Sequence, residues 1–156
     1  MDTFSKENLH DFIVKAKSKT YAAKGPKSLA YRPDSHDLQY QEGAFAYLDS
    51  YFGGTDFLGQ EVVYFEGKAM WVMNYYGRIT DPTHLSAAQA GSIIMESLST
   101  LYENGRFLGG YEHQTDVGNY VDSNTGDLTS FQGVEWIEVQ GQKAYELVYH
   151  GGLVKT

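Results

Sequence analysis

The chain has 156 residues, the length of one domain with a single sizeable core, so we expect one domain spanning residues 1–156. Its 20 Asp and Glu residues outnumber its 12 Lys and Arg residues, giving a net charge of −8. This acidity argues against direct nucleic-acid binding, because phosphates demand a basic surface. Cysteine is absent, which excludes disulfides, thiolate nucleophiles and cysteine-based metal sites. The 13 Tyr and 17 Gly residues, against 3 Pro, are typical of a β-rich chain.

Charge is distributed unevenly along the chain. Residues 1–27 hold six lysines and three acidic residues, a net charge of +3 that leaves −11 for the remainder. A solvated helix face explains this asymmetry, and we favour that interpretation. The alternative is a basic first helix that contacts an acidic partner or covers its own acidic sheet.

The N-terminal residues show a polar helix pattern and not the basic and apolar segments of a secretory signal. No apolar run approaches the ~20 residues that span a bilayer. We therefore expect a cytoplasmic protein without a membrane partner.

Two helices are predicted from capping signals and apolar periodicity. The first has Ser5 as its N-cap and ends near Tyr21. Its apolar stripe comprises Leu9, Phe12, Ile13 and Ala16. The second is predicted to open at Asp81-Pro82 and to stop at Asn104-Gly105. Its apolar stripe comprises Ala87, Ala90, Ile94, Leu98 and Leu101.

Most of the remaining chain alternates in the manner of β-strands. The predicted strands cover residues 38–42, 44–51, 61–65, 69–76, 107–112, 119–122, 128–139 and 143–150. The order of elements predicts an α+β fold, with a curved, mainly antiparallel sheet of about six to eight strands. The N-terminal helix and one inserted helix are expected to pack on this sheet. No convincing internal repeat is apparent from the sequence.

Pairing the predicted strands places polar groups in one row. A two-residue turn at Gly67-Lys68 puts Glu61 opposite Asn74, and the glycine turn at residues 53–54 puts Asp49 near Glu61. The same face would carry Tyr47, Tyr51, Val63, Val72 and Tyr76. A slip of one residue would move a side chain in this row to the opposite face.

Two carboxylates in aromatic surroundings suit acid–base chemistry, because burial and mutual repulsion raise the pKa of one of them. The candidate catalytic residues are therefore Asp49 and Glu61. The candidate ligand-binding residues are Tyr47, Asp49, Tyr51, Glu61, Trp71, Asn74, Tyr76, Tyr111 and His113. A buried hydrogen-bond network without chemistry is the alternative interpretation. No motif predicts a metal site, a cofactor, a phosphate-binding loop or a hydrolase nucleophile.

Four stretches resemble a bacterial family known as a domain of unknown function. They are YLDSYFGGTDFLGQEVVY (residues 47–64), WVMNYYG (71–77), GRFLGGY (105–111) and YELVYHGG (145–152), and the resemblance extends from Leu9 onward. The motif residues include Asp49, Tyr51, Glu61, Trp71, Asn74 and Tyr75. Members of that family occur alone or C-terminal to XRE-type helix-turn-helix regulators. The resemblance implies a free-standing form of a sensory module and carries over no catalytic residue.

Three functions remain open from the sequence. The first is a small-molecule-binding or sensory module with its pocket on the concave face of the sheet. A cationic ligand would suit it, because aromatic faces and carboxylates attract cations. The second is a metal-independent hydrolase or isomerase that uses Asp49 and Glu61 as its acid–base pair. The third is an interaction module, such as a homodimer formed through a tyrosine-rich strand edge.

Overall fold

The first helix, α1 (Lys6–Lys19), forms as predicted in the computed structural model, which describes residues 4–21, 27 and 29–155. Ser5 is its N-cap and accepts a hydrogen bond of 3.0 Å from the backbone N–H of Asn8. The whole predicted apolar stripe is buried, which confirms the face that this helix turns toward the sheet.

The second helix, α2 (Ala87–Glu103), begins later than predicted. Its N-cap is Ser86, which forms a capping box with Gln89, so the predicted start at Asp81-Pro82 is wrong. The capping box satisfies two backbone N–H groups reciprocally, which Asp81 cannot do from its position in the preceding loop. The helix ends at Asn104, as predicted.

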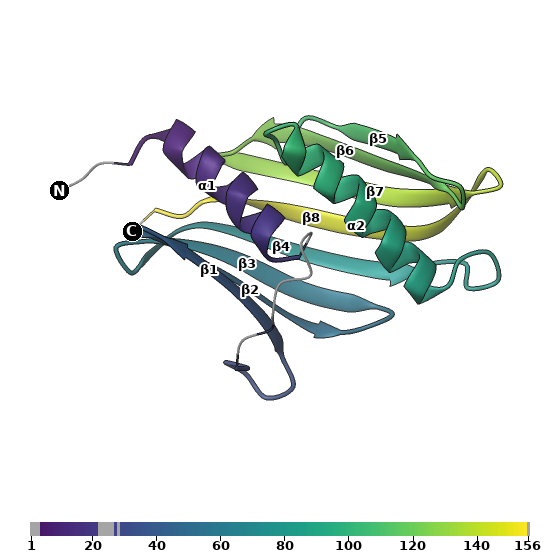
Figure 1. The fold of residues 1–156 in the computed structure, drawn as a ribbon, viewed down its shortest axis with the longest axis horizontal. Coiled ribbons are helices and arrows are strands. Elements are labelled where there is room, and N and C mark those ends of the chain that lie inside the picture. The colour runs from purple at the N-terminus through teal and green to yellow at the C-terminus, as the bar shows by residue number, and fades with distance from the viewer. Residues whose placement is uncertain (1–3, 22–26, 28, 156) are drawn as a thin grey trace.

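The described residues also form eight strands in one open antiparallel sheet, which confirms the predicted α+β fold class (Figure 1). The strands are β1 (His36–Glu42), β2 (Phe45–Gly53), β3 (Phe57–Phe65), β4 (Lys68–Ile79), β5 (Tyr111–Gln114), β6 (Asn119–Asp127), β7 (Ser130–Val139) and β8 (Gln142–Leu153). Their order across the sheet is β1-β2-β3-β4-β8-β7-β6-β5. Thus β4 and β8 lie at the centre and β1 and β5 at the edges.

Both helices cover the same face of the sheet (Figure 1). Helix α1 contacts the outer strands β1 and β2, and α2 contacts β5 and β6 at the other side. The sheet therefore curves toward the helices, and its concave face is the one they cover. Neither helix in the described part of the chain has the length and apolar character needed to cross a membrane.

The fold repeats one unit twice, which the sequence alone did not reveal. Each unit is a helix followed by a four-stranded meander, first α1–β4 and then α2–β8. The strand order reads identically outward from the centre in both directions. The two hairpin turns are also equivalent, since Gly67 and Gly141 have φ angles of 77° and 79°. The two halves are therefore related by an approximate two-fold axis.

Short motifs recur at equivalent places in the two halves. Tyr-x-Asp ends at Asp49 and Asp122, Gly-x-Glu ends at Glu61 and Glu135, and Tyr-x-Gly begins at Tyr75 and Tyr149. In the central strand pair Tyr75 lies directly opposite Tyr149. The approximate two-fold axis therefore passes between these two tyrosines.

The predicted pairing of β3 with β4 is wrong by one residue. The turn comprises Glu66 and Gly67, and a bulge between Val63 and Tyr64 adds one residue to β4, so Glu61 pairs with Met73 instead of Asn74. Because strand side chains alternate between faces, the added residue moves Asn74 to the convex face. The equivalent register shift occurs in the second half, between Ile137 and Glu138.

A glycine lets each central tyrosine lie across its neighbouring strand. Gly59 pairs with Tyr75, and a Cβ atom at Gly59 would lie 2.4 Å from the tyrosine hydroxyl. Tyr75 thereby reaches over β3 to Asp49 on β2, with a hydrogen bond of 2.6 Å. In the second half, a Cβ atom at Gly133 would lie 2.3 Å from the Tyr149 ring.

The repeat predicts that equivalent substitutions in the two halves lower the stability of the protein by similar amounts. Gly59→Ala and Gly133→Ala should each lower the free energy of unfolding by about 1–3 kcal/mol, because a methyl group displaces a packed tyrosine. Urea denaturation measures both effects. Gly91→Ala is the control, since a Cβ atom there meets nothing within 4 Å and should stabilise α2. A neutral effect at either strand glycine would contradict this account.

Candidate functional site

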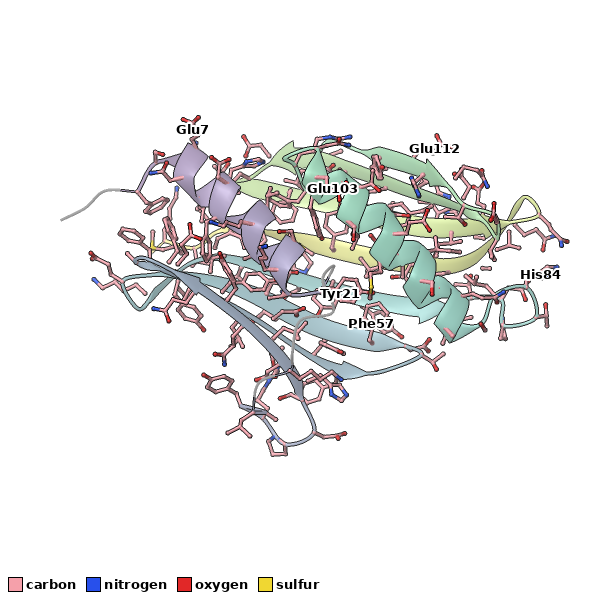
Figure 2. The ribbon with its side chains drawn as sticks, in the orientation of Figure 1. Glu7, Tyr21, Phe57, His84, Glu103 and Glu112 are labelled. Atoms are coloured by element: carbon pink, nitrogen blue, oxygen red, sulfur yellow. The ribbon has the colours of Figure 1, made fainter. Side chains whose placement is uncertain are left out.

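A cavity of about 390 Å³ lies between the helices and the concave face of the sheet. The apolar stripe predicted for α2 forms one wall, and all five of its members line the cavity: Ala87, Ala90, Ile94, Leu98 and Leu101. Tyr21 and Phe57 also line it, and Figure 2 shows them between the helices and the sheet. The cavity is of the size typical for small-molecule sites.

In the first half of the repeat, Glu61 is held by a lysine and a tyrosine. The Lys17 ammonium donates to its Oε2 at 2.5 Å, and the Tyr47 hydroxyl donates to its Oε1 at 2.7 Å. Lys17 is 4% exposed and Glu61 7% exposed, so this is a buried ion pair. The Lys17 ammonium also lies 6.0 Å from the ring centroid of Trp71 and 5.6 Å from that of Phe107. A lysine of helix α1 thus pairs with an acidic residue of the sheet that the helix covers. This agrees with the alternative interpretation of the basic N-terminal region and not with the favoured one, a solvated helix face.

In the second half, Glu135 occupies the position equivalent to Glu61, but tyrosines alone hold it. Its Oε2 accepts a hydrogen bond from Tyr120, and its Oε1 accepts one of 3.1 Å from Tyr145. Asp122, equivalent to Asp49, accepts a hydrogen bond of 2.7 Å from the Tyr149 hydroxyl. Each half of the cavity therefore presents one glutamate and one aspartate.

Burial perturbs the acidity of these carboxylates. Burial and, to a smaller extent, the nearby charge of Glu61 together raise the pKa of Asp49 to about 7. Burial also raises the pKa of Glu135 to about 7, with Asp122 contributing in the same direction. The pKa of Asp122 is raised as well, again chiefly by burial. Ionising these groups together is therefore costly unless a positive charge joins them.

The two aspartates retain hydrogen-bonding capacity. Tyr75 donates to Oδ1 of Asp49, and Tyr149 donates to Oδ1 of Asp122. The Oδ2 atom of each accepts no hydrogen bond from any residue that the structure describes. Both side chains are at least nine-tenths buried and line the cavity. These two oxygens are therefore available to accept hydrogen bonds from a bound molecule.

Several residues predicted for the site do meet at the cavity. Asp49 and Glu61 are direct cross-strand partners, as predicted, and both line the cavity with Tyr51. Two further predicted residues, Tyr47 and Trp71, are buried behind this lining. Tyr47 bonds Glu61, and the Trp71 indole N–H donates to the backbone oxygen of Leu128 at 3.2 Å.

Other predicted residues lie elsewhere. Asn74 and Tyr76 lie on the convex face, where Asn74 accepts a hydrogen bond of 2.8 Å from Gln60. Tyr111 and His113 lie on the edge strand β5 and do not line the cavity; His113 forms a hydrogen bond with Glu96 instead.

The convex face also carries an exposed apolar row across four strands, formed by Leu58, Tyr76, Val148 and Val134. The interaction role of the protein stays a prediction.

The lining residues that the sequence analysis did not predict for the site include the polar residues Lys17, Tyr75, Asp122, Glu135 and Tyr149. The recurrence of the three short motifs in the second half of the chain is the signal that would have identified the latter three. Lys17 has no such signal, because only packing brings α1 onto β3. Among the described residues, no three His, Asp or Glu side chains converge closely enough to hold a metal ion.

The buried ion pair generates a stability prediction. Lys17→Met should lower the free energy of unfolding by about 3–5 kcal/mol, because it leaves the Glu61 charge buried without its partner. The double variant Lys17→Met/Glu61→Gln should recover most of this loss. Chemical denaturation of the two variants and the wild type measures the difference. Equal stability of the single and double variants would contradict the pairing.

The raised pKa values generate a prediction about pH. In the folded state Asp49 holds its proton up to about pH 7, whereas the unfolded chain releases it near its ordinary pKa of 3.8. Stability should therefore fall as pH rises from about 4 to about 7, by about 1.4 kcal/mol per pH unit for each such group, and level off above that range. Asp49→Asn should flatten this dependence, and Glu146→Gln on the exposed surface should leave it unchanged. Denaturation curves across this pH range test the expectation.

Comparisons with known proteins place the chain in a family without assigning it an activity. No curated protein and no solved structure matches the chain. A family model described as a domain of unknown function, DUF5680, matches residues 49–154, which is more than half of the 156 residues. The matched span contains Asp49, Glu61, Asp122 and Glu135 but not Lys17. The chain therefore belongs to the DUF5680 family of domains of unknown function.

Proposed function

We propose that this protein binds a small organic molecule with a cationic group in the cavity between its helices and its sheet. The observation that carries the proposal is the excess of buried carboxylates over buried cations in this cavity. Asp49, Glu61, Asp122 and Glu135 are each buried, and Lys17 is the buried cation among the described lining residues. A ligand cation would offset the cost of ionising the remaining carboxylates.

The walls of the cavity support an organic ligand. They are formed largely by aliphatic and aromatic side chains, among which are Ile94, Leu101, Phe57, Tyr102 and Tyr145. Aromatic rings attract cations through their negative faces, and a few convergent polar groups in an apolar pocket give a ligand its orientation. An ammonium group attached to an apolar body fits both features. The resemblance to modules that accompany helix-turn-helix regulators agrees with a sensory use of such binding.

An acid–base reaction by the pair Asp49 and Glu61 has weaker support. The two carboxylates share a face, which that hypothesis requires. However, both oxygens of Glu61 already accept hydrogen bonds, from Lys17 and Tyr47. This arrangement holds Glu61 as a paired anion, and so we favour binding over catalysis by this pair.

Calorimetric titration with three matched probes tests the proposal. Phenethylammonium should bind to the wild-type protein, and phenethyl alcohol and hydrocinnamate, its neutral and anionic counterparts, should bind at least about tenfold more weakly. The double variant Asp49→Asn/Asp122→Asn should lose this preference for the cation. The control variant Glu146→Gln, which removes an exposed carboxylate outside the cavity, should retain it. Equal affinity for the three probes, or no binding of the ammonium probe, would overturn the proposal.

A further inference from the structure

The two halves of the cavity differ at one helical position. Counted from the serine N-caps Ser5 and Ser86, Lys17 of α1 and Leu98 of α2 occupy the same place in their helices. Four buried positions coincide under this alignment, which supports it: Leu9, Phe12, Ile13 and Ala16 of α1 correspond to Ala90, Ile93, Ile94 and Ser97 of α2. Both side chains line the cavity. The first half thus contains a built-in ammonium group, and the second half has an apolar side chain at the equivalent place.

The Lys17 ammonium shows how this scaffold binds a cation. It lies between the carboxylate of Glu61 and the rings of Trp71 and Phe107. Carboxylate pairing and cation–π attraction therefore act on it together, in a site from which water is largely excluded. The chain's own lysine occupies the cation site of the first half.

The second half repeats the surroundings without the lysine. Glu135 stands in for Glu61, and Tyr145 stands in for Trp71 at the equivalent strand position. The ring stacking is repeated as well, since Phe57 stacks on Tyr145 at 6.4 Å just as Phe131 stacks on Trp71 at 5.7 Å.

Further groups face this second half of the cavity. Tyr102 of α2 and Tyr149 of β8 line the cavity, and so does Asp122, whose Oδ2 atom accepts no hydrogen bond from a described residue. Two cationic side chains act on these carboxylates from a distance: Arg106 and Lys17 both favour the ionised form of Asp122, and Lys17 also favours that of Glu135. Arg106 donates to the backbone oxygens of Leu108 and Gly110 and does not line the cavity, and Lys17 is paired with Glu61. The second half therefore presents anionic and aromatic groups, and no cationic side chain among the described residues forms an ion pair with Asp122 or Glu135.

We propose that the ligand's cationic group binds in the second half of the cavity, beside Asp122 and Glu135, at the place that the Lys17 ammonium occupies in the first half. This assignment rests on the proposed function. It makes Lys17 and Leu98 specificity-determining residues, because one half is filled by the chain and the other is left open. The ligand class that follows is a molecule with a single ammonium group and an apolar body.

Placing a lysine in the second half tests the assignment. Leu98→Lys should supply an internal cation there and weaken phenethylammonium binding by at least about tenfold in calorimetric titration. Leu98→Met, which has a similar length and no charge, should bind within about threefold of the wild type. Equal binding by the two variants would overturn the assignment.

A second pair of variants decides the matter if Leu98→Lys does not fold. Asp122→Asn and Asp49→Asn remove equivalent carboxylates from the two halves, so each is the matched control of the other. Asp122→Asn should weaken phenethylammonium binding about tenfold more than Asp49→Asn does. An equal or reversed effect would overturn the assignment but leave the proposed function standing. Failure of the wild type to bind the probe would overturn both.

Discussion

Four carboxylates lie buried on the concave face of one sheet, and each accepts a hydrogen bond from a tyrosine. A buried carboxylate without such a partner would be costly, so these bonds constrain the strands that carry them. The constraint explains the glycines at positions 59 and 133, which let Tyr75 and Tyr149 lie across a strand to reach an aspartate. Tyrosine satisfies the hydrogen-bonding needs of a carboxylate but does not neutralise its charge. The charge of an ionised carboxylate in the cavity is therefore offset either by a proton or by a cation.

Duplication of a helix and a four-stranded meander explains why the site has two similar halves. The approximate two-fold axis between Tyr75 and Tyr149 brings the two glutamates and two aspartates around one cavity. The two halves differ at Lys17 and Leu98, which occupy corresponding positions in their helices. The lysine pairs with the glutamate of its own half, and the leucine leaves the other glutamate without such a pair.

The stability and binding properties of this site share one origin. Desolvation raises the pKa of Asp49 and Glu135, so these two carboxyl groups hold their protons up to about pH 7. A cation bound beside them, as proposed, would compete with those protons for the same oxygens. The proposed cation binding should therefore strengthen as the carboxylates ionise, and the stability of the protein should fall as pH rises toward that range. The raised pKa values and the proposed affinity for a cation have the same cause, which is the burial of these carboxylates.

The sequence by itself determined the α+β class, the apolar face of each helix and the pairing of Asp49 with Glu61. These follow from local signals: an N-cap serine, helical periodicity, strand alternation and a glycine turn. The tertiary structure alone decided that Asn74 faces away from the site. The bulge beside Val63 adds one residue to β4, and no turn motif in the sequence indicates this bulge. The tertiary structure also decided that Lys17, Asp122 and Glu135 share a cavity with Asp49. Those contacts join segments far apart in the chain, and they form only when the two halves pack around a common axis.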